Sequence, residues 1–446
     1  MRHLSAYVRS LNPDLPRQVW ILQAGGLANF FGNGIVLPFL IIYLHNVRGI
    51  SLAVAGLIAA TNAVAGLLSG ALGGALVDRV GPRATLTGAL LVMAGAFSAF
   101  PLITEAWHAF ALNALAGLGS GAFWPSQSSL LTRLTPPHRR HQAFAQQRVT
   151  MNLGFGLGGL VGGLIASAEA AGTFTVLFLL DGASFLVFAA ILLRLPAGRA
   201  PGQARGERSG GRYADVLRNR PFVAFLSLNV LFIAVGIVPL SEFFPVFSKN
   251  EAGVSETGIG LIFLVNTLAI VLTQVPIARA LEGRRRMRVL AAMGVLWAAV
   301  WLVVLVVGAT LAGIAATVVL AAAMVAFALG ECLHGAVQGP MVVDLSDPRL
   351  LGRYMALSSI SWQVGFIVGP AVGGFVLHSE PLALWALAAA LCLAGAAWAL
   401  RLERHLPRSA WVTPVGGHAP APEPPPVPVV GETGAAAAVA RRPTGA

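Results

Sequence analysis

Three polar side chains with acid–base or hydrogen-bonding chemistry share one face of a long apolar stretch. Glu331, His334 and Gln338 stand at positions i, i+3 and i+7, a spacing that places them on the same side of a helix. A carboxyl group in apolar surroundings favours its neutral form, so it can take up and release a proton near neutral pH. The spacing therefore predicts a proton-carrying Glu331 that can also meet a cationic ligand, with His334 beside it. The alternative is structural, with a protonated Glu331 that forms a hydrogen bond between helices.

Two further acidic side chains stand in apolar stretches, where a carboxylate is costly unless it is paired. Asp181 is a candidate for proton coupling, but its apolar flanks are also typical of a paired structural acid. Glu242 lies between Pro239 and Pro245. It either faces an outer vestibule or marks the end of an irregular helix.

Amide and aromatic side chains on other apolar stretches complete the set of candidate ligand-binding residues. Asn29 and Asn33 stand four residues apart on one helix face, and Asn229 lies on a later stretch. Gln127, with Trp124 nearby, occupies the position that corresponds to Gln338 in the repeat described below. Amides bind polar groups of a ligand without charge, but they also join helices to each other in membranes.

The composition places these residues inside a membrane. Of 446 residues, 56% are hydrophobic and only 11% are charged, far below the average for soluble domains. Apolar runs of 18 or more residues predict membrane-spanning helices. The sequence predicts an all-α integral membrane protein with twelve spans. They are 18–44, 52–77, 84–104, 107–132, 144–168, 173–193, 221–248, 257–280, 289–308, 312–340, 354–377 and 381–402.

The Arg and Lys residues predict the orientation, because they collect in cytoplasmic loops. With both termini on the cytoplasmic side, 28 of the 30 basic residues fall on inner segments, and only Arg48 and Lys249 fall on outer loops. The net charge of +12 is spread over short loops and forms no continuous basic face, so we expect no nucleic-acid partner. We expect a multi-pass protein in a lipid bilayer.

The two halves of the chain repeat. A shift of 211 residues aligns 152–163 with 363–374, with six of twelve positions identical, and a shift of 204 aligns Asn62 with Asn266. This predicts two related six-helix bundles with a ligand site between them near mid-membrane. The glycine-rich segments predict close helix packing. The residues of this packing motif are Gly154, Gly158, Gly162, Gly163, Gly365, Gly369, Pro370, Gly373 and Gly374.

The repeat and the polar connections divide the chain into five parts. These are a cytoplasmic N-terminus (1–17), an N-terminal bundle (18–193), a cytoplasmic central loop (194–220), a C-terminal bundle (221–402) and a disordered Pro/Ala-rich cytoplasmic tail (403–446). We expect Cys332 and Cys392 to be buried without a disulfide. Trp297 and Trp301 are expected to face lipid or to anchor the chain at the interface.

A charged turn follows the second span, with the pattern G-x-x-x-D-R-x-G-x-R at Gly74, Asp78, Arg79, Gly81 and Arg83. This pattern resembles the loop between helices 2 and 3 of major facilitator superfamily transporters, apart from Pro82. The resemblance implies a conformational gate in which Asp78 pairs with a basic residue such as Arg133, or with the start of the eleventh span. The alternative is a plain cytoplasmic hairpin.

The resemblance extends over residues 18–402 and is greatest to bacterial drug:proton antiporters, because 330–334 and 344–355 resemble their tenth helix and the loop that follows. Two positions depart from that group: Asn113 replaces an Arg of the fourth helix, and Gly159 replaces a Pro of the fifth. The resemblance implies alternating access and proton-coupled export of lipophilic or cationic small molecules, that is, drug efflux. It also implies a location in the bacterial plasma (inner) membrane. The alternatives are uptake or exchange of a small polar metabolite, or a non-transporting receptor.

The sequence does not favour an enzyme. It contains neither a G-x-x-x-x-G-K phosphate loop nor an H-E-x-x-H metal pair, so we expect no cofactor and no metal. The expected partners are a small-molecule substrate and protons, and we expect the chain to act as a monomer.

Overall fold

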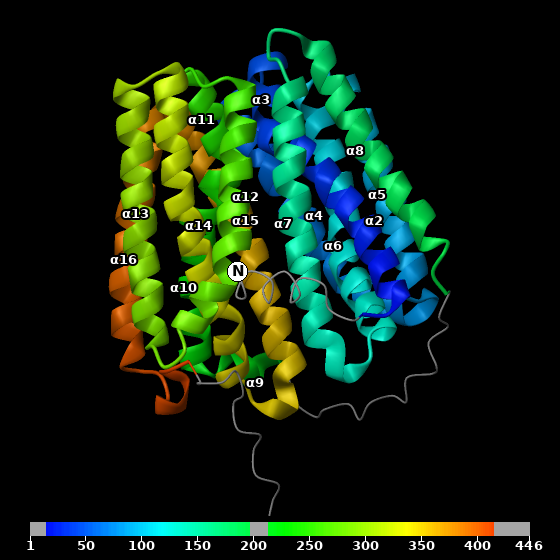
Figure 1. The fold of residues 1–446 in the computed structure, drawn as a ribbon, viewed down its shortest axis with the longest axis vertical. Coiled ribbons are helices and arrows are strands. Elements are labelled where there is room, and N and C mark those ends of the chain that lie inside the picture. The colour runs from blue at the N-terminus through cyan, green and yellow to red at the C-terminus, as the bar shows by residue number, and fades with distance from the viewer. Residues whose placement is uncertain (1–14, 197–212, 414–446) are drawn as a thin grey trace, which may run out of the picture.

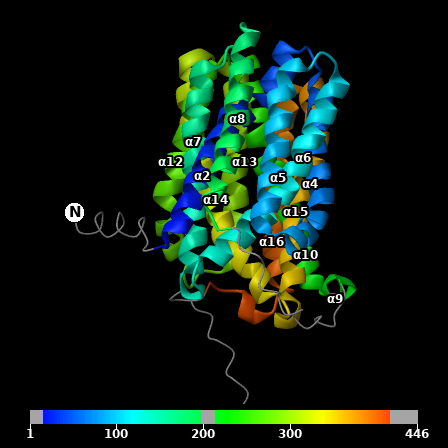
Figure 2. The same ribbon diagram turned by 90° about the vertical axis from the view of Figure 1, so that its right-hand side faces the viewer.

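The computed structural model describes residues 15–196 and 213–413, and helices form nearly all of this part of the chain. Residues 1–14, 197–212 and 414–446, which include parts of the predicted N-terminus, central loop and tail, lie outside the described residues. The long helices run roughly side by side along the longest axis of the molecule (Figures 1 and 2), and Figure 1 shows that they form two groups.

Each group contains six long helices, and short helices lie in five of the ten connections between them. The first group consists of α2 (Arg17–Val36), α4 (Leu52–Val80), α5 (Pro82–Ala99), α6 (Ala106–Leu134), α7 (Arg140–Ile165) and α8 (Ala171–Leu192). The second consists of α10 (Arg220–Phe232), α12 (Glu256–Ala280), α13 (Arg286–Thr310), α14 (Gly313–Asp344), α15 (Leu351–Ser379) and α16 (Pro381–Glu403).

The first helix of each group is continued by short helical segments. In the first group these are η1 (Leu37–Phe39), α3 (Leu40–Ile42) and η2 (Tyr43–Val47), and in the second η5 (Ile233–Ile237), η6 (Pro239–Phe243) and α11 (Phe244–Asn250). The remaining short elements are η3 (Phe100–Leu102), η4 (Pro137–Arg139), α9 (Tyr213–Leu217), η7 (Pro348–Leu350) and η8 (Arg408–Ala410).

Eleven helices of the described residues are long and apolar enough to cross a membrane. Each coincides with a predicted span to within a few residues at most ends. The remaining predicted span, 107–132, forms α6, which is long but not among the eleven. Asn113, Ser126 and Gln127 are buried within it and lower its apolar character. The count of twelve spans and the cytoplasmic termini stay predictions.

The predicted repeat corresponds to equivalent local contacts in the two groups. Ser51 caps α4 by accepting a hydrogen bond from the amide of Val54, and Ser255 caps α12 by accepting one from Gly258. Both members of the second pair lie 204 residues after those of the first. A second pair of equivalent hydrogen bonds, made by Asn62 and Asn266, lies deeper in the two groups.

The amide Nδ2 of Asn62 donates to the carbonyl of Asn113 at 3.3 Å, and that of Asn266 donates to the carbonyl of Met324 at 3.4 Å. The donors are related by the shift of 204 residues and the acceptors by the shift of 211. The two groups are therefore built to the same plan at the level of single hydrogen bonds.

The glycines of the predicted packing motif divide into two classes. Gly154, Gly158 and Gly162 pack against α2 and η1, and their counterparts Gly365, Gly369 and Gly373 pack against the segments from η5 to η6. The fourth glycine of each set contacts the other group. Gly163 meets Gly260 of α12, and Gly374 meets Gly56 of α4.

The groups meet at one end, which we call the outer end, where α2 connects through η2 to α4. There α3 and α11 are in contact, at the top of Figure 1. Hydrogen bonds also join the groups at this end: Asn46 donates to Asn250 at 2.8 Å, and the hydroxyl of Thr257 donates to the carbonyl of Gly163 at 3.0 Å. The opposite end, where α4 turns into α5, is the inner end.

Helices α4 and α15 separate toward the inner end. Gly56 and Gly74 lie 18 residues apart, which is five helical turns, so both point to the same side of α4. Gly56 touches the backbone of α15 at Pro370 and Gly374, whereas a side chain at Gly74 would meet nothing within 4 Å. The two groups are thus in contact at the outer end, and α4 and α15 are apart at the inner end.

The core of the second group corrects the prediction for two aromatic residues. Trp297 and Trp301 are fully buried, and their indole nitrogens donate to the carbonyls of Phe327 and Val235 at 3.2 and 2.9 Å. They are structural side chains of the bundle interior and not lipid-facing anchors. Cys332 and Cys392 are buried and free, as expected.

The beginning of the predicted disordered tail is ordered. After α16, residues 404–413 form η8 and return to the connection between α12 and α13, where Val412 forms an isolated antiparallel bridge with Arg285. The Arg285 guanidinium lies over the Trp411 ring and forms a 2.6 Å ion pair with Glu403. We call residues 404–413 the strap. The prediction of disorder was wrong for it, because backbone pairing and aromatic contacts hold it in place.

Candidate functional site

The polar face of α14 lies at the boundary between the two groups. Glu331, His334 and Gln338 share this face as predicted, and Gly335 lies among them. Glu331 and Gln338 are half-buried, and His334 is buried. Each of the three side chains has a partner on another helix of the second group.

Glu331 is held by an uncharged donor. The amide Nδ2 of Asn266 on α12 donates to its Oε2 at 3.1 Å. Among the described residues, no cation forms an ion pair with Glu331. A carboxyl group in this setting can be neutral or ionised without breaking a salt bridge, which is the property that a reversible proton carrier needs.

His334 and Gln338 belong to a hydrogen-bonded network with α10 and α15. The Nε2 of His334 lies 2.9 Å from the Oδ1 of Asn229, and the Nδ2 of Asn229 donates to the hydroxyl of Ser361 at 2.9 Å. Gln338 donates at 2.9 Å to the hydroxyl of Ser358, which lies one helical turn before Ser361 on α15. The network joins three helices and presents amide, imidazole and hydroxyl groups near the boundary.

The amide candidates of the first group lie apart from this network. Asn29 and Gln127 are buried, and neither polar atom of the Asn29 side chain has a hydrogen-bond partner among the described residues. Asn33 is half-buried. Trp124 is the exposed member of the set, and its ring stacks on Phe30 at 6.0 Å between centroids.

The two other candidate acids are not part of the Glu331 site. Asp181 is fully buried on α8 in the first group, where Ser184 donates to its Oδ1 at 3.3 Å. Gly32 of α2 faces it, and a side chain there would overlap Asp181 and Ser184. Glu242 is half-buried in η6, near the outer end of the second group.

The charged turn is located at the inner end. Asp78, Arg79 and Arg133 are exposed, and Asp78 has no ion-pair partner among the described residues in this conformation. Gly81 has φ +90°, a left-handed conformation that glycine adopts without strain, and it separates α4 from α5. The predicted pairing of Asp78 stays a prediction for a conformation in which the inner ends close.

Arg83 has a structural partner in the same turn. Its guanidinium donates to the carbonyls of Leu195 and Leu193 at 2.6 and 3.2 Å, just after α8. The segment after the sixth long helix thus holds the inner turn of the first group. In the second group, the strap contacts the corresponding connection between α12 and α13.

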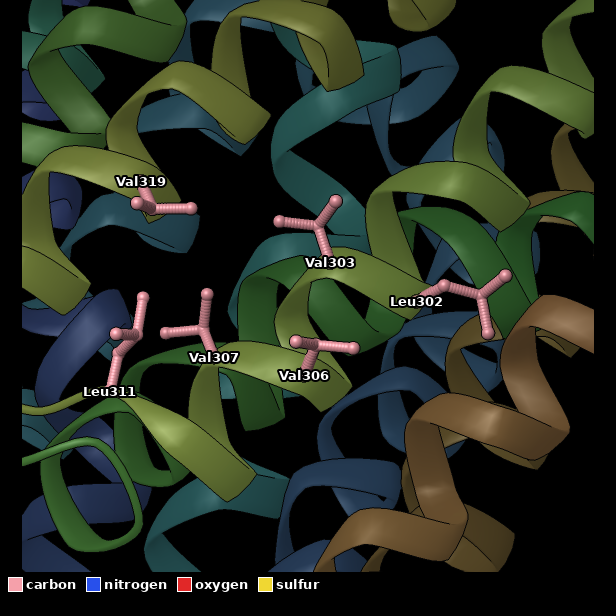
Figure 3. Close-up of a pocket in the computed structure, with 6 residues that line it drawn as sticks. All are labelled: Leu302, Val303, Val306, Val307, Leu311 and Val319. Carbon is pink, nitrogen blue, oxygen red and sulfur yellow. The ribbon is translucent and has the colours of Figure 1, made fainter.

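An apolar groove between α13 and α14 lies away from the polar face. Figure 3 shows its lining, which consists of Leu302, Val303, Val306, Val307, Leu311 and Val319. It offers no polar group to a ligand. Within residues 15–196 and 213–413, no group of three His, Cys, Asp or Glu side chains could hold a metal ion.

Sequence reasoning did not single out two residues that lie against the polar face of α14. Asn266 appeared only as the repeat counterpart of Asn62, although an amide inside a span is a polar group that needs a partner. Arg148 was counted only as a basic residue of the inner side. It lies within an apolar helix that is long enough to span a membrane, Gln142–Ile165, and a charge in such a position is a candidate for contact with a ligand.

Comparison with protein families gives a match over most of the chain. The family model described as Major Facilitator Superfamily matches residues 24–255 and 222–442. The MFS-type transporter YqjV of Bacillus subtilis (strain 168) is 25% identical over 389 residues, which are 84% of this chain and 91% of the relative. The multidrug resistance protein MdtH of Aeromonas hydrophila subsp. hydrophila is 25% identical over 362 residues, or 80% and 87% of the two chains.

Solved structures with the same fold include transporters of different solutes. The nucleoside transporter NupG matches with a TM-score of 0.70 and 14% identity, covering 87% of this chain and 99% of its own. The peptide transporter POT in complex with sulfate matches with a TM-score of 0.72 and 16% identity, covering 88% and 96%. At these identities the likeness establishes the fold alone.

Proposed function

The chain belongs to the Major Facilitator Superfamily, and we propose that it exports lipophilic or cationic small molecules across the bacterial inner membrane in exchange for protons. It is a multi-pass membrane transporter and not an enzyme. The relatives named MdtH are multidrug resistance proteins, and this supports efflux of foreign compounds.

One observation carries the proposal of proton coupling. Glu331 lies half-buried at the boundary between the two groups and is held by the neutral amide of Asn266, without an ion pair among the described residues. A carboxyl group held in this way can exchange its proton when the boundary opens to water. A cationic substrate competes for the ionised form, so binding of substrate and release of the proton are linked.

The open inner end supports the proposed direction. With the outer ends in contact and α4 and α15 apart at the inner end, a compound from the inner side would reach the boundary without crossing the outer closure. Closure of the inner end and opening of the outer end then expose the same site to the other side, which is alternating access.

Proton movement in energised inside-out vesicles tests the proposal. A panel of lipophilic cations is added to vesicles that contain the wild type, Glu331→Gln or, as matched controls, Asp181→Asn and Glu242→Gln. We expect the cations to release protons from the lumen for the wild type and both controls, and not for Glu331→Gln. Release that survives Glu331→Gln but is lost in one of the controls would assign the coupling to that other acid.

The second candidate function is uptake or exchange of a small polar metabolite. The network of Asn229, His334 and Ser361 favours it, since these groups can hydrogen-bond to polar substituents of a solute. A wild type that responds to no cation in the vesicle assay, but accumulates a polar solute, would establish this alternative in place of drug efflux.

A further inference from the structure

Arg148 brings a positive charge from the first group onto the polar face of α14 in the second. A Cβ atom at Gly335 would lie 3.4 Å from the guanidinium Nη1 of Arg148. Gly335 is four residues after Glu331 and three before Gln338, so it lies in the middle of that face. The missing side chain at Gly335 leaves room for the guanidinium over the candidate site.

The charge of Arg148 is available to a ligand. Its side chain is exposed, and among the described residues no carboxylate forms an ion pair with it. An unpaired arginine within the span-forming part of α7 is costly, and arginines in such positions are typical of substrate or ion pathways.

A guanidinium is suited to one class of ligand group. Its planar set of N–H donors matches the two oxygens of a carboxylate, whereas a purely cationic compound is repelled by it. Glu331, on the same face, is suited to the opposite charge. The two residues belong to different groups of helices, so a ligand that contacts both would connect the two sides of the boundary.

We propose that Arg148 is an anion-binding residue of this site and that the preferred substrates carry a carboxylate in addition to their lipophilic, cationic part. This inference rests on the proposed function for the direction in which the substrate is transported. The preference of the site for a carboxylate does not depend on proton coupling. Among the lipophilic cations that the chain accepts, those that also carry a carboxylate should therefore bind most tightly.

A matched pair of dyes tests the inference by equilibrium binding to the purified full-length protein. Rhodamine B carries a free carboxylate beside its cationic ring system, and its ethyl ester is the same cation without the carboxylate. We expect the wild type to bind rhodamine B more tightly than the ester. Arg148→Gln should weaken binding of rhodamine B about tenfold or more, as expected for a lost charge-assisted hydrogen bond, and leave the ester unchanged or tighter.

Two further variants separate a ligand contact from a general effect. Arg148→Lys keeps the charge but not the bidentate geometry, and we expect an intermediate loss for rhodamine B alone. Arg140→Gln removes an exposed charge at the start of the same helix, and we expect it to change neither dye. Equal weakening of both dyes by Arg148→Gln, or no change in either, would overturn the inference.

The vesicle assay distinguishes this inference from the proposed function. Dye discrimination that depends on Arg148, without proton release in the vesicles, would support the binding role of Arg148 and reject proton-coupled export. Proton release driven by simple cations, with no discrimination between the two dyes, would support export and reject the anion-binding role.

Discussion

Gly163 of α7 and Gly260 of α12 lie backbone against backbone across the boundary between the two groups. A Cβ atom on Gly163 would lie 3.0 Å from the Cα of Gly260, and one on Gly374 would lie 3.0 Å from the Cα of Gly56. Separations this short leave no space for a side chain. The outer closure therefore depends on the absence of a methyl group at each of these positions.

Gly163→Ala should open the outer end. The added methyl group overpacks the contact with α12, which typically costs about 1–3 kcal/mol, and only conformations with the outer end closed carry this cost. We expect faster thiol labelling of a cysteine placed at Phe263, which lies at the boundary, in a background without Cys332 and Cys392. The control is Gly88→Ala, where a side chain has open space. Equal labelling of both variants would contradict the role of the closure.

Asp78→Asn should reduce transport without impairing insertion or folding. In this conformation Asp78 is exposed at the inner end and has no ion-pair partner among the described residues, so its loss removes no native contact here. The expected defect arises when the inner ends close and the carboxylate meets a basic residue or a helix N-terminus. Transport by reconstituted protein and the amount of folded protein in the membrane are the two measurements. A variant with normal transport would remove Asp78 from the mechanism.

Asn229→Ala should destabilise the second group. Asn229 contacts both His334 and Ser361, so its removal leaves buried polar groups without their partner, at a cost of about 1–3 kcal/mol. A lower Tm of the purified protein is expected. Asn33→Ala is the comparison, because no hydrogen bond of the Asn33 side chain joins it to the described residues. A Tm shift of similar size in both variants would show that the network does not stabilise the bundle.

Asp344→Ala should destabilise the inner end of the second group by on the order of 3 kcal/mol, because it leaves the buried Arg286 guanidinium without its carboxylate. The pair is separated by 2.5 Å, with Arg286 almost fully buried and Asp344 partly exposed. Thermal unfolding in detergent measures the loss. Replacing both partners, as in Arg286→Met with Asp344→Leu, should restore most of the stability, and failure to do so would mean that the charges have another role.

The sequence was sufficient to predict the helical fold because a membrane span must be both long and apolar. The same property explains the error at Trp297 and Trp301. Lipid and the bundle interior are both apolar, so hydropathy does not distinguish an aromatic side chain that faces lipid from one that is buried between helices. The strap could not be predicted either, because its stability comes from pairing with residues more than a hundred positions earlier.

The candidate site was predictable only along one helix. The spacing of Glu331, His334 and Gln338 follows from helical periodicity alone, and the structure places them on one face. Their partners on other helices, such as Asn266, depend on how those helices pack, and so does the approach of Arg148 to Gly335. Periodicity within one segment contains no information about which segment lies opposite.

The α4–α5 turn and the α12–α13 connection are held in place by segments that are synthesised at different times. Arg83 is held by the carbonyls of Leu193 and Leu195, which emerge before any helix of the second group has been synthesised. The connection between α12 and α13 is held by Trp411 and Val412, which are synthesised after the last long helix. Because synthesis proceeds from the N-terminus, the first group can complete its assembly during translation, while the second cannot until the strap has left the exit tunnel.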